Sequence, residues 1–338
     1  MSNLENRIQV FPIQKSQGFY SFGHMGEFQI LNSINHGNLS EIFKAKQKED
    51  DISENSKNFY YAIKVCKKCD LSQNNSNQNP PKRLLFNEIC EININNKVRA
   101  IGNPNLVQMY DWSIDRKTTE VRILMEYMPY DLRNYFSKKE NYLQLNENLL
   151  KNFTFQILNG LNALHKNRII HFDLKPENIL YNPENNIIKI ADFSVSQIVT
   201  YDLDKKILIN GGTYSYQPIE SLMQTKDISF NCDMWSLGCI LLELSCRINP
   251  FKGNSPNKVI NNIISVLGMD KASLTNFDEY AKNSLNNKGI IDFIKNNKKI
   301  KFINEDFHDL VAKMLQINPM ERITAEEALN HPWLVDHV

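Results

Sequence analysis

The chain has 338 residues, 42% of them hydrophobic, which is enough for one large domain or for two lobes with cores of their own. Its 39 Lys and Arg residues against 38 Asp and Glu residues give a net charge of +1. That balance provides no field to attract nucleic acid or an anionic membrane, so we expect neither as a partner. The first residues are polar and the longest apolar run, near residues 237–244, is too short to span a bilayer. We therefore expect an intracellular protein, in the cytoplasm, the nucleus or both.

The six cysteines indicate buried thiols. Cys66 and Cys69 have the spacing of half a zinc site, but no second pair has such spacing. Cys232, Cys239 and Cys246 recur every seven residues, which places them on one face of a helix. We expect all of them to remain reduced.

The first recognisable strand pattern begins at Phe28, because residues 1–25 carry no clear period. The segment 34–45 then reads as a hairpin with Gly37 at its tip. A glycine in such a tip lets backbone N–H groups approach a phosphate, although an ordinary hairpin would look the same.

A strand and a helix follow, and both carry charges of interest. Residues 59–65 are strand-like and contain Lys64, which alone would read as a solvated lysine on a sheet edge. Residues 84–98 have helical spacing and contain two carboxylates, Glu88 and Glu91.

The next elements lead into the second half of the chain. Residues 121–127 form an apolar strand, and Asp131 can cap a helix that begins at Leu132. From residue 149 to residue 164 apolar side chains recur at every third or fourth position, which predicts a core helix.

The polar groups with the clearest chemical meaning lie in residues 169–180, between two apolar runs. Asp173 could accept a proton, Lys175 could stabilise a phosphate oxygen, and Asn178 could offer a carbonyl oxygen to a hard metal ion. Asp192 follows at the end of another short strand and could be a second metal ligand. Each Asp alone could also be an ordinary turn residue.

As a set, these segments resemble the eukaryotic protein kinases. The matching motifs are His-Phe-Asp-Leu-Lys-Pro-Glu-Asn at 171–178, Asp-Phe-Ser at 192–194, Ala-Ile-Lys at 62–64 and Gly-Thr-Tyr-Ser-Tyr-Gln-Pro-Ile-Glu at 212–220. The resemblance implies an α+β, two-lobed kinase-like fold, with a small antiparallel β-sheet lobe that has one key helix and a large, mostly α-helical lobe. The expected organisation is an N-terminal extension at 1–25, an N-lobe at 26–127 with polar insertions at 46–58 and 70–82, and a C-lobe at 128–338 with an insertion at about 270–305.

The resemblance also implies the site. The expected catalytic residues are Asp173 and Lys175, and the expected magnesium ligands are Asn178 and Asp192. The expected ATP-binding residues are Lys64, Glu91, Gly37, Ile42, Ala62, Met125, Glu126, Met128, Asp131 and Leu180, with Glu126–Met128 as the hinge between lobes. Glu91 is favoured over Glu88 as the partner of Lys64, because the apolar residues that follow it have the family's spacing.

Three further contacts are implied. Thr213 is expected to join the hydrogen-bond network of Asp173 and Lys175, and Asp233 is expected to hold the backbone of the catalytic loop. Glu220 and Arg322 should form a buried ion pair.

The implied activity is transfer of the ATP γ-phosphate to Ser or Thr hydroxyls of protein substrates, with Mg²⁺. Lys175 marks the serine/threonine class, and residues 263–269 resemble the cyclin-dependent and mitogen-activated kinases. No cyclin-binding signature is evident in residues 84–98. Residues 212–220 build a peptide-binding shelf, which disfavours a small-molecule kinase.

Several positions depart from the family pattern. Phe172 replaces the Arg that receives an activation-segment phosphate, which predicts activity independent of such phosphorylation. Ser194 replaces Gly after the metal-binding Asp, while Asn35 and Ser40 replace glycines of the phosphate loop. A pseudokinase scaffold is therefore the alternative, although every charged group that touches phosphate or metal is present.

Overall fold

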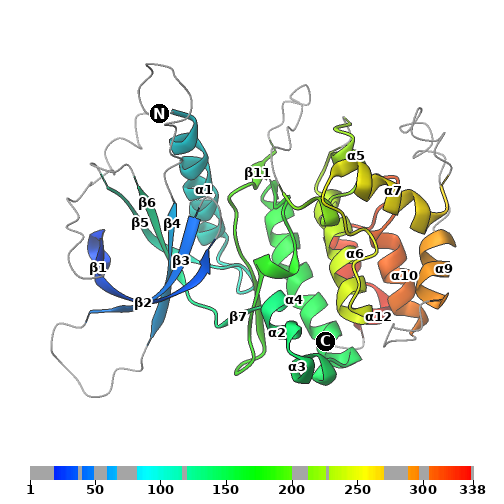
Figure 1. The fold of residues 1–338 in the computed structure, drawn as a ribbon, viewed down its shortest axis with the longest axis horizontal. Coiled ribbons are helices and arrows are strands. Elements are labelled where there is room, and N and C mark those ends of the chain that lie inside the picture. Colours follow the sequence, from blue (N-terminus) through cyan, green and yellow to red (C-terminus); the bar gives the residue numbers. More distant parts are fainter. Residues whose placement is uncertain are drawn as a thin grey trace. The chain divides into compact units, whose positions relative to one another are not determined.

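The computed structural model describes residues 19–36, 40–48, 59–66, 82–115, 120–199, 212–225, 228–269, 288–296 and 304–335. Two compact units result, one ending at Gly102 and resuming over Val107–Met128, the other formed by Asn103–Leu106 and the chain from Pro129 onward. Figure 1 labels the elements of both. Gly37, Cys69 and most of the three predicted insertions lie outside the described residues.

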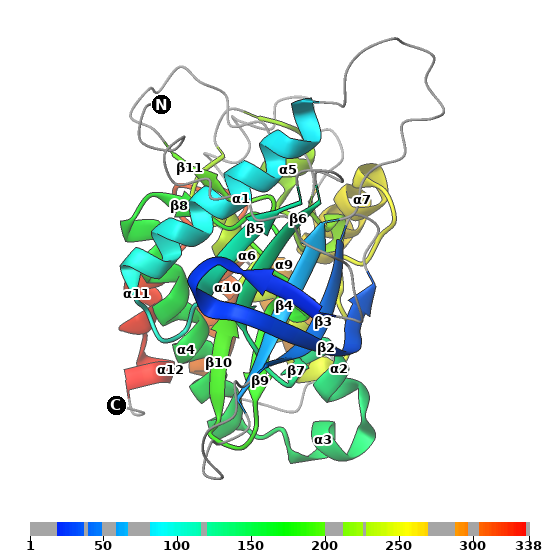
Figure 2. The ribbon, with the colours of Figure 1, turned by 90° about the vertical axis from the view of Figure 1, so that its left-hand side faces the viewer.

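The first unit is built on a six-stranded antiparallel sheet with the order β1-β2-β3-β4-β6-β5. Its elements are β1 (Phe19–Phe22), the short 3-10 helix η2 (Gly23–Met25), β2 (Gly26–His36), β3 (Ser40–Gln47), β4 (Tyr60–Cys66), α1 (Lys82–Ile101), β5 (Met109–Ile114) and β6 (Val121–Glu126). Helix α1 packs on one face of this sheet, against β5 (Figure 2).

The two faces of the sheet carry separate cores, because successive side chains of a strand point to opposite faces. On one face Ile63 packs with Phe28 in a cluster of aromatic and aliphatic residues. On the other face Ile123 packs with Ile92 of α1. Since Lys64 follows Ile63, it points to the face that α1 covers.

Strand β1 lies within the segment that the sequence indicated only as an N-terminal extension. It pairs with β2 in antiparallel register, with Phe22 opposite Gly26. Pairing buries Phe22 completely, and its ring lies edge-on to Phe28 with centroids 5.7 Å apart. The short strand lacks a periodic signal because only this one of its side chains is fully buried.

The second unit is mostly helical. Its elements are β7 (Tyr130–Asp131), α2 (Leu132–Ser137), α3 (Lys139–Gln144), α4 (Glu147–Lys166), β8 (Ile169–Ile170), η3 (Pro176–Asn178), β9 (Ile179–Asn182), β10 (Ile187–Ile190), β11 (Gln197–Ile198), η4 (Tyr214–Tyr216), α5 (Ile219–Leu222), α6 (Asn231–Cys246), α7 (Pro256–Leu267), α9 (Lys288–Asn296), α10 (Glu305–Met314), α11 (Ala325–Leu329) and α12 (Pro332–Val335). Two small sheets, β10-β9-β7 and β11-β8, complete it. A sheet unit with one long helix and a mostly helical unit confirm the predicted α+β class.

Helices α4 and α6 form the core of the second unit. The side chain of Asn146 accepts a hydrogen bond from the Leu149 amide at 2.9 Å and so caps α4, whose predicted apolar face is buried. Helix α6 is buried along almost its whole length, and it carries the buried thiols of Cys232, Cys239 and Cys246. Among the described helices, none has both the length and the hydrophobicity needed to cross a membrane.

Candidate active site

The loop between β8 and η3 gathers the predicted catalytic groups of the second unit. Lys175 Nζ lies 2.6 Å from Asp173 Oδ2 and donates to Thr213 Oγ1 at 3.0 Å. Thr213 Oγ1 in turn donates to Asp173 Oδ1 at 2.9 Å. Asn178 Nδ2 donates to the Asp173 carbonyl at 2.8 Å. Both carboxylate oxygens of Asp173 are thereby held in fixed directions, as a group that must orient a hydroxyl requires.

A buried carboxylate at the start of α6 holds the backbone of this loop. The amides of His171 and Phe172 donate to Asp233 Oδ2 and Oδ1 at 2.9 and 3.0 Å. Burial is the largest single effect and would raise the pKa of Asp233. The hydrogen bond from His165 at 2.9 Å, the charges of His165 and His171 and the hydrogen bond from the His171 amide together outweigh burial, so the pKa is lowered. The carboxylate is therefore ionised at neutral pH, and the predicted role of Asp233 as the loop's anchor is confirmed.

His171 links the catalytic loop to the segment that follows β10. Its Nε2 lies 3.0 Å from the carbonyl of Ala191, and its Nδ1 accepts from the Asp173 amide at 3.3 Å. Both contacts are satisfied by the neutral ring with its proton on Nε2. The next residue, Asp192, has a positive φ of 64°, an uncommon backbone conformation for a residue other than glycine.

The first unit contains the predicted ion pair. Lys64 Nζ lies 2.6 Å from Glu91 Oε1, and the two side chains are 7% and 5% exposed. Glu88, the alternative partner, lies on the same helix α1, and its buried Oε2 has no hydrogen-bond partner among the residues that the structure describes. Burial raises the pKa of the Glu88 carboxyl, although the charge of Lys64 acts in the opposite direction. The pairing predicted from the apolar spacing of α1 is thus the one the structure has.

Comparison with known proteins decides the family. The model of the protein kinase domain matches residues 28–334. This chain belongs to the protein kinase family. The kinase is similar to a probable cyclin-dependent serine/threonine-protein kinase of Dictyostelium discoideum, with 29% identity over 319 residues, covering 92% of the chain and 21% of the relative.

Two further relatives are cyclin-dependent kinases of other organisms. Cyclin-dependent kinase 11.2 of Caenorhabditis elegans is 28% identical over 325 residues, which cover 93% of the chain and 46% of the relative. Cyclin-dependent kinase G1 of Arabidopsis thaliana is 30% identical over 327 residues, which cover 91% of the chain and 49% of the relative. The chain therefore spans less than half the length of each of these relatives. The predicted protein kinase family is confirmed, and the α+β fold agrees with it.

Three more predicted nucleotide residues of the first unit share one face of its sheet. Ile42 lies opposite Lys64, and Ala62 lies opposite Met125, in antiparallel register. Opposed residues of neighbouring strands point to the same face, which is the face of Lys64. Glu126 ends β6, two residues before the buried Met128.

Two predicted nucleotide residues belong to the second unit of the kinase. Asp131 and Leu180 are directly opposed in the β7–β9 pair. The Asp131 carboxylate accepts from the Asn134 amide at 2.8 Å and caps α2, which is the alternative reading of this residue. Capping engages Oδ1, and Oδ2 accepts from the Asn134 side chain.

Asn178 and Asp192 fit the requirements of a magnesium ion shared with phosphates. The described hydrogen bonds of the Asn178 side chain use Nδ2, which leaves Oδ1 as a neutral oxygen ligand. The Ala191 amide donates to the Asn178 carbonyl at 2.9 Å, which holds the two metal-binding segments together. No cluster of three or more His, Cys, Asp or Glu side chains that could hold a metal alone occurs in the described part of the kinase. The remaining ligands would thus come from phosphate and water.

Phe172 occupies its position as a core residue. Its side chain is 6% exposed and packs with Ile170, Ile228 and Cys232, although its backbone has a φ of 65°. Apolar contacts therefore fill the place where the family has a phosphate-binding Arg. Ser194 is exposed and is not among the described residues with positive φ, so it needs no glycine-like freedom.

The segment after Thr213 is anchored by the predicted buried ion pair. Arg322 Nη1 and Nη2 lie 2.7 and 3.2 Å from the two carboxylate oxygens of Glu220. Both side chains are 0% exposed. Arg322 also donates to the carbonyls of Gln316 and Asn231, so its charge is fully hydrogen-bonded.

A second cluster, centred on Arg133 of α2, was not predicted from the sequence. Its guanidinium contacts Glu243 at 2.5 Å, Glu177 at 2.8 Å and the Tyr216 hydroxyl at 2.5 Å. Burial and the neighbouring carboxylate of Glu243 raise the pKa of Tyr216, so its phenol stays neutral. The cluster ties α2 to the catalytic loop, to η4 and to α6. Arg133 carries no signal for this role, since an arginine on a short helix usually reads as a solvated residue.

Proposed function

We propose that this kinase transfers the γ-phosphoryl group of ATP to serine or threonine hydroxyls of protein substrates. The observation that supports it most is the network of Asp173, Lys175 and Thr213, because it presents an oriented carboxylate beside a fixed ammonium. In phosphoryl transfer the protein chiefly positions reactants and offsets charge, so such a network matches the task.

Each side chain has one assigned role. Asp173 orients the substrate hydroxyl and accepts its proton, and Lys175 neutralises charge that develops on the transferred group. Asn178 and Asp192 would hold Mg²⁺, which would shield the phosphate oxygens. Lys64, fixed by Glu91, would bind the α- and β-phosphates.

The test uses the whole chain and radiolabelled ATP with a library of serine- and threonine-containing peptides. Asp173→Asn keeps the side-chain shape but removes the base, so we expect the turnover to fall by about 10²–10⁴-fold. Asp306→Asn is the control, because it makes the same change on an exposed residue of α10 and should retain most activity. Transfer that is equal in wild type and Asp173→Asn would contradict the assigned base.

The pseudokinase alternative predicts a different pattern. In that case ATP with Mg²⁺ would raise the melting temperature without any phosphate transfer, or neither effect would occur. For an active kinase we expect both effects, and we expect Asp192→Asn to weaken the Mg²⁺-dependent part of the thermal shift. The change in melting temperature measures nucleotide binding, and the radiolabel measures phosphate transfer. The two measurements together therefore distinguish an active kinase from a pseudokinase.

A further inference from the structure

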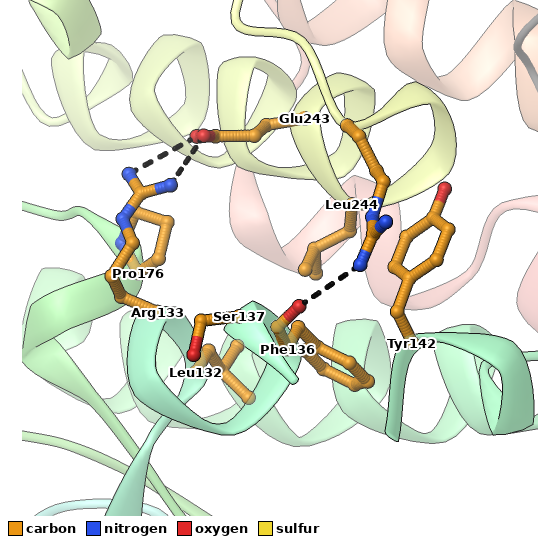
Figure 3. A pocket seen from close by; sticks show the side chains of 9 residues that line it. Leu132, Arg133, Phe136, Ser137, Tyr142, Pro176, Glu243 and Leu244 are labelled. Carbon is orange, nitrogen blue, oxygen red and sulfur yellow. Dashed lines mark hydrogen bonds and ion pairs between the residues drawn. The ribbon is translucent and has the colours of Figure 1, made fainter. Parts of the chain in front are cut away.

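A pocket of about 430 Å³ lies in the second unit, between α2, α3, α6 and Pro176 (Figure 3). None of the residues predicted to bind ATP, Mg²⁺ or the substrate hydroxyl lines it. Its volume is within the range of about 300–1,000 Å³ that is usual for small-molecule sites. The pocket is therefore a second candidate site, apart from the one described above.

The walls of the pocket are mostly apolar. Leu132 and Phe136 come from α2, Leu244 comes from α6, and all three side chains are buried. Tyr142 of α3 forms another wall and is also buried. Such walls gain little from a fully polar ligand and favour one with an aromatic or aliphatic body.

Two arginines border these walls, and they differ in whether a carboxylate is bound to them. Arg133 is neutralised by Glu243, as the dashed lines of Figure 3 show, and by the other partners of its cluster. Arg247, the C-cap of α6, stacks on the Tyr142 ring at 3.8 Å and donates to the Phe136 carbonyl at 3.5 Å. Within the described part of the chain, no carboxylate lies within 4.0 Å of the Arg247 guanidinium.

The contrast between the paired Arg133 and Arg247, which pairs with no carboxylate of the described residues, determines which ligand charge the pocket favours. A guanidinium offers a fork of N–H donors that matches a carboxylate, and stacking on Tyr142 fixes the plane of the Arg247 fork. Of the two carboxylates bound to Arg133, only that of Glu243 lines the pocket, while Glu177 lies outside the lining. The charged side chains that line the pocket are thus two arginines and one glutamate, so the lining has a net positive charge.

We propose that this pocket binds a small amphipathic carboxylate. Its apolar body would lie against Leu132, Phe136 and Leu244, and its carboxylate would pair with Arg247. The ligand would also touch Pro176, the residue after Lys175, and so reach the end of the catalytic loop. The proposal concerns binding alone and holds whether or not the chain transfers phosphate.

The test compares three probes of equal shape by calorimetric titration of the whole chain without nucleotide: 3-phenylpropanoate, 3-phenylpropanamide and 3-phenylpropylamine. We expect the acid to bind about tenfold more tightly than the amide, because only the acid forms a charge-assisted pair. Arg247→Gln should remove this preference. Arg99→Gln makes the same change of charge on an exposed residue of α1 and should leave the preference intact.

A second variant tests the location of the site. Ser137 is exposed at the edge of the pocket, so Ser137→Phe can fill the pocket without disturbing the core. We expect it to weaken the acid and the amide alike, with an unchanged melting temperature. The proposal is overturned if none of the probes binds, if the amine or amide binds as tightly as the acid, or if Arg247→Gln or Ser137→Phe binds the acid like the wild type.

Discussion

Removing Arg322 should destabilise the second unit strongly, because it strands a buried charge. Its partner Glu220 is 0% exposed and receives both of its short ion-pair contacts from this one guanidinium. Loss of one member of a buried pair costs about 3–5 kcal/mol, far more than the pair's net contribution. We therefore expect Arg322→Met to lower the free energy of unfolding by about 3–5 kcal/mol.

The measurement is urea unfolding followed by tryptophan fluorescence. Trp235 is a suitable reporter, because its ring lies 5.2 Å from the Arg322 guanidinium and is fully buried. The matched control is Lys166→Met, which breaks a 2.8 Å pair with Glu326 whose side chains are 56% and 63% exposed. Such an exposed pair is worth at most about 1 kcal/mol.

A double variant separates the stranded charge from the lost contact. Glu220→Met with Arg322→Met removes both charges together, so its loss should be smaller than the sum of the two single losses. The reasoning is refuted if Arg322→Met is no less stable than Lys166→Met, or if the double loss equals that sum.

Three other variants or treatments test the site. Phosphatase treatment of bacterially produced kinase should change turnover by less than about twofold, because Phe172 offers no cation to a phosphate; a large loss would contradict this. The pKa of Asp233 is lowered from 3.8, so its contribution to stability is present above that pH and is lost as the pH falls below it. Unfolding free energies measured against pH should therefore show a shallower acid slope for Asp233→Asn, and an unchanged slope would count against the anchor. Glu91→Gln should slow phosphate transfer by about 10- to 100-fold, while Glu88→Gln should not, and equal rates would disprove the assigned pairing.

The parts of the fold that the sequence predicted are those with a local period or a motif of fixed spacing. Helix α4 was readable because its apolar residues recur with the helical period, and Glu91 was separable from Glu88 by the apolar residues after it. The roles of Thr213 and Asp233 followed from family motifs, and the contacts of both are as predicted.

The remainder depends on contacts between residues far apart in sequence. Arg133 meets Glu243, which lies 110 residues away, and no period connects the two. Phe172 could be recognised as a departure from the pattern, but its burial required the positions of Ile228 and Cys232. A single sequence does not reveal such long-range contacts, because each residue fits the ordinary pattern of its own segment.

The hydrogen bonds to Asp233 explain how this kinase can accommodate Phe172 beside the carboxylate of Asp173. The Asp233 carboxylate accepts hydrogen bonds from main-chain N–H groups, which every amino acid except proline supplies, and not from any particular side chain of the loop. The backbone conformation of the catalytic loop thus does not depend on which side chain stands at position 172. Evolution can exchange a switchable side chain there for a permanently packed one and leave the geometry of Asp173 undisturbed.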